Sequence, residues 1–276
     1  MLTRKIDNAL YESYSDDIPQ LLKKIYAARS VTESQLSMTL PDLLKPSFDQ
    51  LNIALDLLQK CIEEDRRILI VGDFDADGAT ASVVAIKALR LMGAKYVDFL
   101  VPNRFKHGYG LSPEIVNEAK LEKEPNLIIT VDNGISSNEG TALARSLGID
   151  VIITDHHLPP KVLPDANAII NPNLRECDFP SKNLAGVGVC FYLFSSLKTH
   201  LDSIGYFKKN NIKVPDLRVL LDLVALGTVA DVVKLDQNNR ILVNEGIKRI
   251  RQKKCSKGIL AILELTKRPI ESLQAS

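Results

Sequence analysis

Five short β-rich runs that alternate with helical patterns constrain the fold of this chain more than any other feature. The runs are RILIVGD, YVDFLVP, NLIITVD, DVIITD and ANAIINP, at residues 67–73, 96–102, 126–132, 150–155 and 166–172. Apolar residues fill them almost continuously, which is typical of strands that are buried on both faces of a sheet. Helical patterns separate the first four runs at about 25 to 30 residues per unit. We therefore predict an α/β fold, with a doubly wound, mainly parallel sheet of about five strands.

Composition limits the class of protein. The 276 residues are 45% apolar and 25% charged, which is typical of a globular chain with a sizeable core. A formal net charge of +1 means that any binding of nucleic acid must depend on local patches. The four cysteines have no C-x-x-C spacing, and no stretch resembles a signal peptide or a membrane span. We expect free thiols, no membrane association and a reducing, cytoplasmic location.

Acidic residues and histidines end three of the predicted strands. They are Asp73, Asp75, Asp77, Asp132, Asp155, His156 and His157. The carboxyl ends of parallel strands share one edge of a sheet, where ligands bind, so we expect these side chains to converge. The alternate spacing of the first three predicts that they lie on one side of an extended segment. Carboxylates with imidazoles suit Mn²⁺ or Mg²⁺, and this many acids fit two ions that share a bridging carboxylate.

A calcium-binding loop and simple helix capping account for these acids less well. The pattern D-x-D-x-D-G resembles the start of a calcium-binding loop, but its twelfth position is Val84 rather than a glutamate. Aspartates at strand–helix junctions also cap helices, which explains Asp73 alone as well as metal binding does. The set as a whole favours a metal site.

The stretch LLDLVALGTVADVV, residues 220–233, adds two carboxylates to an apolar helical pattern. A lone buried carboxylate is costly unless it is paired. Asp222 and Asp231 are nine residues apart, which places them on opposite faces of a continuous helix. We expect one of them to face the strand ends, and a break at Gly227 would change which one.

Four stretches of the chain resemble the signature motifs of the DHH phosphoesterase superfamily. They are DFDADG, VDNG, DHH and DLVALGTVAD, in that order, within a resemblance that extends over about residues 18 to 250. Flanking stretches such as VPNRFKHGYGL and LAGVGV are similar to the bacterial branch of single-strand-specific 5′→3′ exonucleases. The resemblance implies a metal-dependent exonuclease that releases mononucleotides from single-stranded DNA in repair and recombination.

The resemblance also implies residue roles. The implied metal ligands are Asp73, Asp75, Asp77, Asp132, His156 and Asp222, with Asp132 as the bridge. The implied catalytic residues are Asp132, Asp155 and His157, of which His157 contacts the scissile phosphate. The implied substrate-binding residues are Arg104, Tyr109, Asn133 and His157.

The resemblance further suggests a domain plan. We expect an N-terminal helical segment over 1–65 that packs on the core, a DHH catalytic domain over 66–235, and a helical connector over 236–276 that leads to a further domain. The implied partners are single-stranded DNA and a helicase or single-strand-binding protein, and the implied oligomeric state is a monomer.

Two basic stretches are candidates for contact with a strand. The loop NRFKHGYG offers Arg104 for phosphates and Tyr109 for stacking on a base, although a tyrosine packed on the core is the alternative. The stretch KRIRQKKCSK, residues 248–257, has six positive charges and no acid. It would line a strand-binding channel or form a solvated helix face.

Two alternative functions stay open. An enzyme of the same superfamily that acts on short oligonucleotides, cyclic dinucleotides or pyrophosphate would need the same metal ligands. A catalytically silent scaffold that binds DNA or protein belongs to another class, and such a scaffold would lose ligands that are all present here.

Overall fold

The computed structural model describes residues 4–36, 38–103 and 107–275, and it divides the chain into two compact units, 1–43 and 44–276. The smaller unit contains helices α1 (Asn8–Glu12) and α2 (Gln20–Ala27) and the 3-10 turns Glu33–Leu36 and Leu40–Asp42. Its centre is Tyr14, which is 4% exposed and packs against the ring of Tyr26 at a centroid distance of 6.3 Å. This unit is therefore a small helical layer with one aromatic contact at its core.

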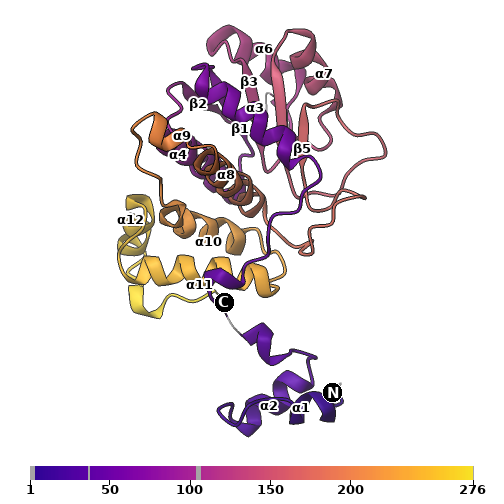
Figure 1. Ribbon diagram of the computed structural model, residues 1–276, viewed down its shortest axis with the longest axis vertical. Helices are drawn as coiled ribbons and strands as arrows, with labels where there is room; N and C mark the ends of the chain where they lie inside the picture. Colours follow the sequence, from indigo (N-terminus) through magenta and orange to yellow (C-terminus); the bar gives the residue numbers. More distant parts are fainter. Residues whose placement is uncertain (1–3, 37, 104–106, 276) are drawn as a thin grey trace. The chain divides into compact units, whose positions relative to one another are not determined.

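The larger unit is built on one parallel sheet (Figure 1). Its strands are β1 (Ile68–Gly72), β2 (Val97–Leu100), β3 (Leu127–Val131), β4 (Asp150–Thr154) and β5 (Ala168–Ile170). They lie in the order β2-β1-β3-β4-β5, and every neighbouring pair is parallel. All residues of β1 and β3 are buried, as their unbroken apolar runs predict. The predicted doubly wound sheet of about five strands is confirmed.

Helices cover both faces of the sheet (Figure 1). On one face lie α6 (Pro113–Glu122) and α7 (Asn138–Ser146), whose apolar residues join those of β1, β3 and β4 in one core. On the other face lie α3 (Leu51–Glu63), α4 (Ala76–Leu91) and α8 (Gly186–Ser203), and α8 packs against both α3 and α4. The two faces are therefore closed from solvent, and the strand ends are left as the place for a ligand.

The remaining helices extend the layer that contains α4. They are α9 (Tyr206–Lys209), α10 (Leu221–Ala230), α11 (Gln237–Arg251) and α12 (Lys257–Leu265), with 3-10 turns at Leu217–Leu220 and Ile270–Ser272. Helix α10 packs against α4, α8 and α11. Its close approach to α4 requires Gly227, because a Cβ there would lie 2.2 Å from Thr80 Oγ1 and 2.9 Å from Asp77 Oδ1. Gly227 therefore brings α10 against α4 without breaking the helix.

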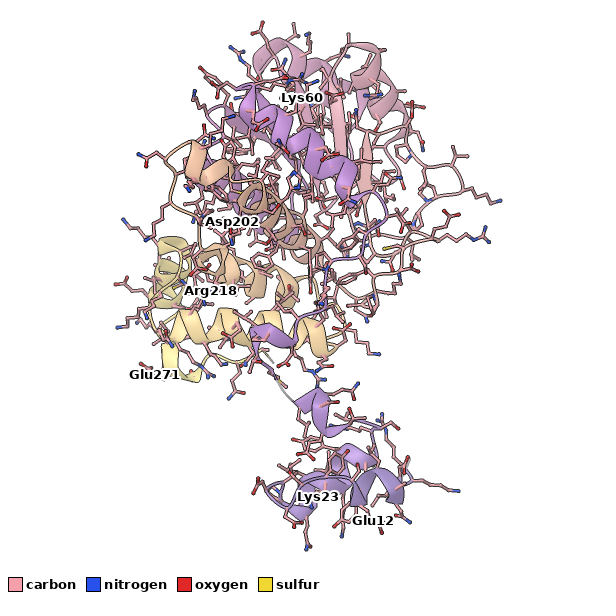
Figure 2. All side chains as sticks on the ribbon, in the orientation of Figure 1. Glu12, Lys23, Lys60, Asp202, Arg218 and Glu271 are labelled. Carbon is pink, nitrogen blue, oxygen red and sulfur yellow. The ribbon has the colours of Figure 1, made fainter. Side chains whose placement is uncertain are left out.

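Amphipathic helices keep their charges outside. Figure 2 labels Lys60 on α3 and Asp202 on α8, both of which are exposed. The opposite side of α3 buries Leu55 and Leu58 against the rest of the unit. This division follows the 3.6-residue period of the helix.

Candidate metal centre

The candidate centre forms where the order of the sheet reverses. The chain passes from β1 outward to β2 and then returns to the other side of β1 as β3. Asp73 directly follows β1, Asp132 follows β3 and Asp155 follows β4. The crevice outside such a reversal is the usual ligand site of a parallel α/β sheet. The structure therefore brings carboxylates from distant parts of the sequence to one edge.

The turn after β3 holds Asp132 in an uncommon backbone conformation. Its φ is 63°, in the left-handed region that aspartate tolerates better than most residues. Its side chain is buried, and its backbone N–H donates to the carbonyl of Thr154 at 3.0 Å. Such conformations cost about 1–3 kcal/mol and cluster at functional sites. The turn directs the Asp132 carboxylate toward the neighbouring strand end.

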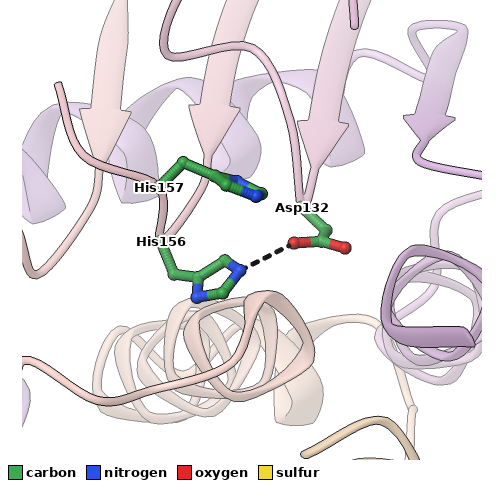
Figure 3. A group of neighbouring side chains, drawn as sticks. All are labelled: Asp132, His156 and His157. Atoms are coloured by element: carbon green, nitrogen blue, oxygen red, sulfur yellow. Dashed lines mark ion pairs between the residues drawn. The ribbon is translucent and has the colours of Figure 1, made fainter. Parts of the chain in front are cut away.

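His156 lies near two carboxylates, and Figure 3 shows its contact with the first, Asp132. Its Nε2 is 3.2 Å from Asp132 Oδ1 and 3.6 Å from Asp231 Oδ2. Both of these oxygens are buried, and neither has a hydrogen-bond partner within the described part of the chain. A buried carboxylate oxygen without a partner is costly, and coordination of a cation removes that cost. The donor set therefore fits a divalent metal ion.

The side chains form three overlapping groups. Within each group, the possible ligand atoms lie within 4.8 Å of one another. The groups are Asp132, His156 and His157; Asp77, His156 and Asp231; and Asp73, Asp75 and Asp132. Asp132 and His156 each belong to two groups. The cluster can thus hold two adjoining cations that share a ligand.

The three aspartates after β1 do not lie on one side of an extended segment. Helix α4 begins at Ala76, so Asp75 is its N-cap and accepts from Gly78 N–H at 2.9 Å. Asp77 lies in the first turn and points to α8, where its two oxygens accept from Gly186 N–H at 2.6 Å and Val187 N–H at 2.9 Å. The prediction failed because the tight N-cap turn ends the extended conformation at Asp75.

The two acids of α10 are separated as their spacing predicts. Asp222 is fully buried away from the cluster, and its Oδ2 accepts from Ser256 N–H at 2.6 Å. Asp231 is the C-cap of α10 and joins the cluster instead. The resemblance implied Asp222 as a ligand and did not include Asp231. A separation of nine residues puts the two acids on opposite faces of a helix, so the sequence shows that only one of them faces the cluster. The spacing does not show which one.

Burial and mutual repulsion raise the pKa of the inner acids. Burial, with the carboxylates of Asp75 and Asp155, raises the pKa of Asp132 to about 9. Burial, with the Asp132 carboxylate, raises the pKa of Asp77 to about 8. Burial also raises the pKa of Asp73 and of Asp231. The cluster thus retains protons at neutral pH, and a cation would displace them.

Asp155 and His157 form a second charged pair beside the cluster. Asp155 is buried, and His157 Nδ1 lies 2.7 Å from its Oδ1. Burial acts to raise the pKa of Asp155, but hydrogen bonds from His157 and from backbone N–H groups outweigh it and lower the pKa. The hydrogen bond to Asp155 raises the pKa of His157 to about 9. His157 is therefore an imidazolium at neutral pH with about half of its side chain exposed.

The residues predicted to bind substrate have different positions. The Tyr109 hydroxyl donates to the Asp132 carbonyl at 3.2 Å, and the residue as a whole is 51% exposed. Asn133 is fully buried, and its amide donates to the carbonyls of Val71 and Val131, so it fastens β1 to β3. Arg104 lies outside the described residues. Among the described members of this set, Tyr109 and His157 are therefore the ones that present accessible surface at the centre.

The fold and the cluster define a parallel α/β protein. Its candidate divalent-metal centre lies at the edge of the sheet where the strand order reverses. The chain belongs to the DHH family, because residues 67–228 match the model described as the DHH family, N-terminal domain. This confirms the superfamily resemblance found in the sequence. Within the described residues, no helix is long and apolar enough to span a membrane.

Curated and solved relatives are similar to this chain over most of its length. It is 53% identical over 262 residues to the single-stranded-DNA-specific exonuclease RecJ of Salmonella typhimurium, an alignment that covers 94% of this chain and 45% of the relative. The chain thus spans about half the length of the curated relatives it matches. A crystal structure of exonuclease RecJ bound to manganese is 33% identical, with a TM-score of 0.69 over 84% of this chain and 55% of that one. The structure of RecJ with Mn²⁺ from Thermus thermophilus is 29% identical, with a TM-score of 0.73 over 94% and 36%.

Proposed function

We propose that this chain is the catalytic core of a metal-dependent exonuclease that hydrolyses single-stranded DNA from its 5′ end to mononucleotides. The observation that carries the proposal is the cluster in which Asp132 and His156 each belong to two overlapping sets of ligand atoms. The names of the similar proteins support single-stranded DNA as the substrate. The direction of digestion rests on the resemblance of the motifs.

The cluster is proposed to hold two Mn²⁺ or Mg²⁺ ions. Asp73, Asp75 and Asp132 would hold one of them, and Asp77, His156 and Asp231 would hold the other. Asp132, whose Oδ1 lies 3.2 Å from His156 Nε2, would be the shared ligand. Oxygen and imidazole donors suit these ions, and the buried, unpartnered oxygens of Asp132 and Asp231 support the assignment. When bound, such ions neutralise the charge of the phosphate and lower the pKa of a water molecule.

The residues around the cluster would orient the phosphate. His157, held as an imidazolium by Asp155, is placed to donate a hydrogen bond to a phosphoryl oxygen. Tyr109 holds the backbone of Asp132 through its hydroxyl and presents the exposed part of its ring to a nucleotide. Each of these groups would position the substrate without forming a covalent bond to it.

We also propose a cytoplasmic, monomeric bacterial protein that works with a helicase or a single-strand-binding protein. The free thiols of all four cysteines support a reducing compartment. The bacterial relative supports the source.

A side-by-side hydrolysis assay tests the function. The Mn²⁺-loaded chain is incubated with a long 5′-labelled single strand, the matching duplex, a dinucleotide and pyrophosphate. We expect preference for the single strand, with labelled mononucleotide as the first product. We expect Asp132→Ala to abolish this activity and Asp202→Ala, an exposed change on α8, to preserve it. Hydrolysis of dinucleotide or pyrophosphate alone would assign the chain to small substrates, and full activity of Asp132→Ala would refute the metal assignment.

A further inference from the structure

A cavity lies at the opposite end of α4 from the acid cluster. Its volume is about 610 Å³, and five basic side chains line it: Lys87, Arg90, Arg249, Lys253 and Lys254. No acidic side chain is among the described residues that line it. Asp77 and Arg90 are near opposite ends of α4, so at about 1.5 Å per residue the two sites are about 20 Å apart. The cavity is therefore separate from the candidate metal centre.

The nearby acids are engaged elsewhere. Asp216 accepts from Arg218 Nε and from its terminal nitrogen, at 2.7 Å and 2.8 Å; Figure 2 labels Arg218. Asp222 is fully buried and accepts from the backbone N–H of Ser256, a residue that lines the cavity. Asp222 thus anchors one wall of the cavity from behind.

Helix dipoles offset only a small part of the positive charge. Arg90 and Arg249 lie in the last turns of α4 and α11, where each helix end contributes about −0.5 charge. The start of α12 contributes about +0.5 charge, which adds to the positive charge of the cavity. Even with the buried Asp222 carboxylate included, about three to four positive charges stay unbalanced. The cavity consequently attracts anions.

The wall of the cavity is held in a defined shape. Arg249 is partly buried, and its Nε is a buried donor that has no hydrogen-bond partner within the described residues. Lys253 lies two residues after the end of α11 with φ at 58°, where glycine is usual, and the N–H of Lys254 donates to the carbonyl of Arg249 at 3.0 Å. On the other side, Lys87 Nζ lies 3.4 Å from Ser256 Oγ. The turn after α11 thus holds Arg249, Lys253 and Lys254 at one cavity together with Lys87 of α4.

From this arrangement we infer that the cavity binds the phosphate of a nucleotide, either free or within a strand. Arginine and lysine donors suit a multiply charged phosphate, and the hydroxyl of Ser256 adds a neutral donor. Leu91, Val219 and Leu220 form an apolar wall against which a sugar or base can pack. The volume is within the range of small-ligand sites. The inference rests on the proposed exonuclease function only for the source of the nucleotide.

Binding is tested by calorimetry in EDTA, where the metal-free acid cluster repels anions and no hydrolysis is expected. The probes are pyrophosphate, dTMP and a twelve-residue oligothymidylate. The variant Arg249→Gln with Lys254→Gln is compared with Lys208→Gln with Lys209→Gln, an exposed pair on α9 that changes the net charge equally. We expect pyrophosphate and dTMP to bind at least tenfold more weakly to the first pair and unchanged to the second. Equal loss in both pairs, or no loss in either, would overturn the inference.

Two further measurements keep the inference separate from folding and from catalysis. A second pair, Lys87→Gln with Lys253→Gln, replaces exposed side chains and is expected to weaken the same probes with an unchanged unfolding temperature. Loss of oligothymidylate binding together with dTMP would assign the site to a strand, and loss of dTMP binding alone would assign it to a free nucleotide. If the chain hydrolyses nothing but the difference between the variants persists, the proposed function fails and the cavity assignment stands.

Discussion

Replacing Asp132 with asparagine is expected to stabilise the metal-free chain while removing its response to metal. The side chain is 1% exposed, so the change replaces a buried ionisable group by a neutral one with little change in volume. Asparagine tolerates the left-handed backbone at this position as well as aspartate does. The effect on stability should therefore come from electrostatics alone.

The size of the effect follows from the pKa of Asp132. Burial and the neighbouring carboxylates raise this pKa from 3.8 to about 9. Between those values the folded chain keeps the proton and the unfolded chain loses it, so each pH unit lowers the free energy of unfolding by about 1.4 kcal/mol. At pH 7 the accumulated cost is about 4 kcal/mol, and asparagine does not incur it. Structural relaxation reduces this figure, so we expect a gain of about 2 to 4 kcal/mol.

Urea unfolding in EDTA measures this difference. The variant should be more stable than the parent chain at pH 7, and the difference should fall to about 2 kcal/mol or less at pH 5. With Mn²⁺ present the order should reverse, because a ligand stabilises only the folded state that binds it. Asp202→Asn, at an exposed site, should stay within about 0.5 kcal/mol of the parent under all conditions. The reasoning would be refuted if the variant were less stable than the parent in EDTA at pH 7, or if the difference in stability did not change with pH.

Four other predictions concern the centre and the acid of α10 that faces away from it. Binding of Mn²⁺ should release protons and tighten from pH 6 to pH 8, because the inner acids, whose pKa values are raised, hold protons that the metal displaces. Calorimetry in buffers of different ionisation enthalpy would detect the release. Gly186→Ala should lower activity about 100-fold, because the added Cβ would lie 2.5 Å from atoms of Asp132. Gly258→Ala, where the added Cβ meets open space, should have no effect in the same assay. Asp231→Asn should weaken Mn²⁺ binding by about tenfold or more. Asp222→Ala should instead cost about 1–3 kcal/mol of stability and leave metal affinity unchanged, and the reverse pattern would make Asp222 the ligand.

The secondary structure around the centre could be predicted from local pattern. Unbroken apolar runs such as Leu127–Val131 are found as buried strands, because a strand inside a parallel sheet has apolar neighbours on both faces. The position of Asp132 at a strand end is equally local, and parallel topology then requires that such ends share an edge. The extended segment expected through Asp77 was wrong, because Asp75 caps α4 and the chain turns there.

The choice between the acids of α10 was beyond local pattern. Spacing alone shows that Asp222 and Asp231 cannot face the same way, but the phase of the helix against its neighbours selects Asp231. That phase depends on the contact at Gly227, where α10 approaches Thr80 of α4. Packing between helices distant in the sequence therefore decides the composition of the cluster.

The sequence by itself determined the sheet, the strand ends and the residue types at the centre, because hydrophobic period and turn chemistry act over a few neighbouring residues. The tertiary structure alone decided that Asp77 turns to the start of α8, that Asn133 fastens two strands, and that Lys87 and Arg249 line one cavity. Each of these depends on the distance and rotation between packed elements. No local pattern records those quantities, because they are set by the fit of the whole core.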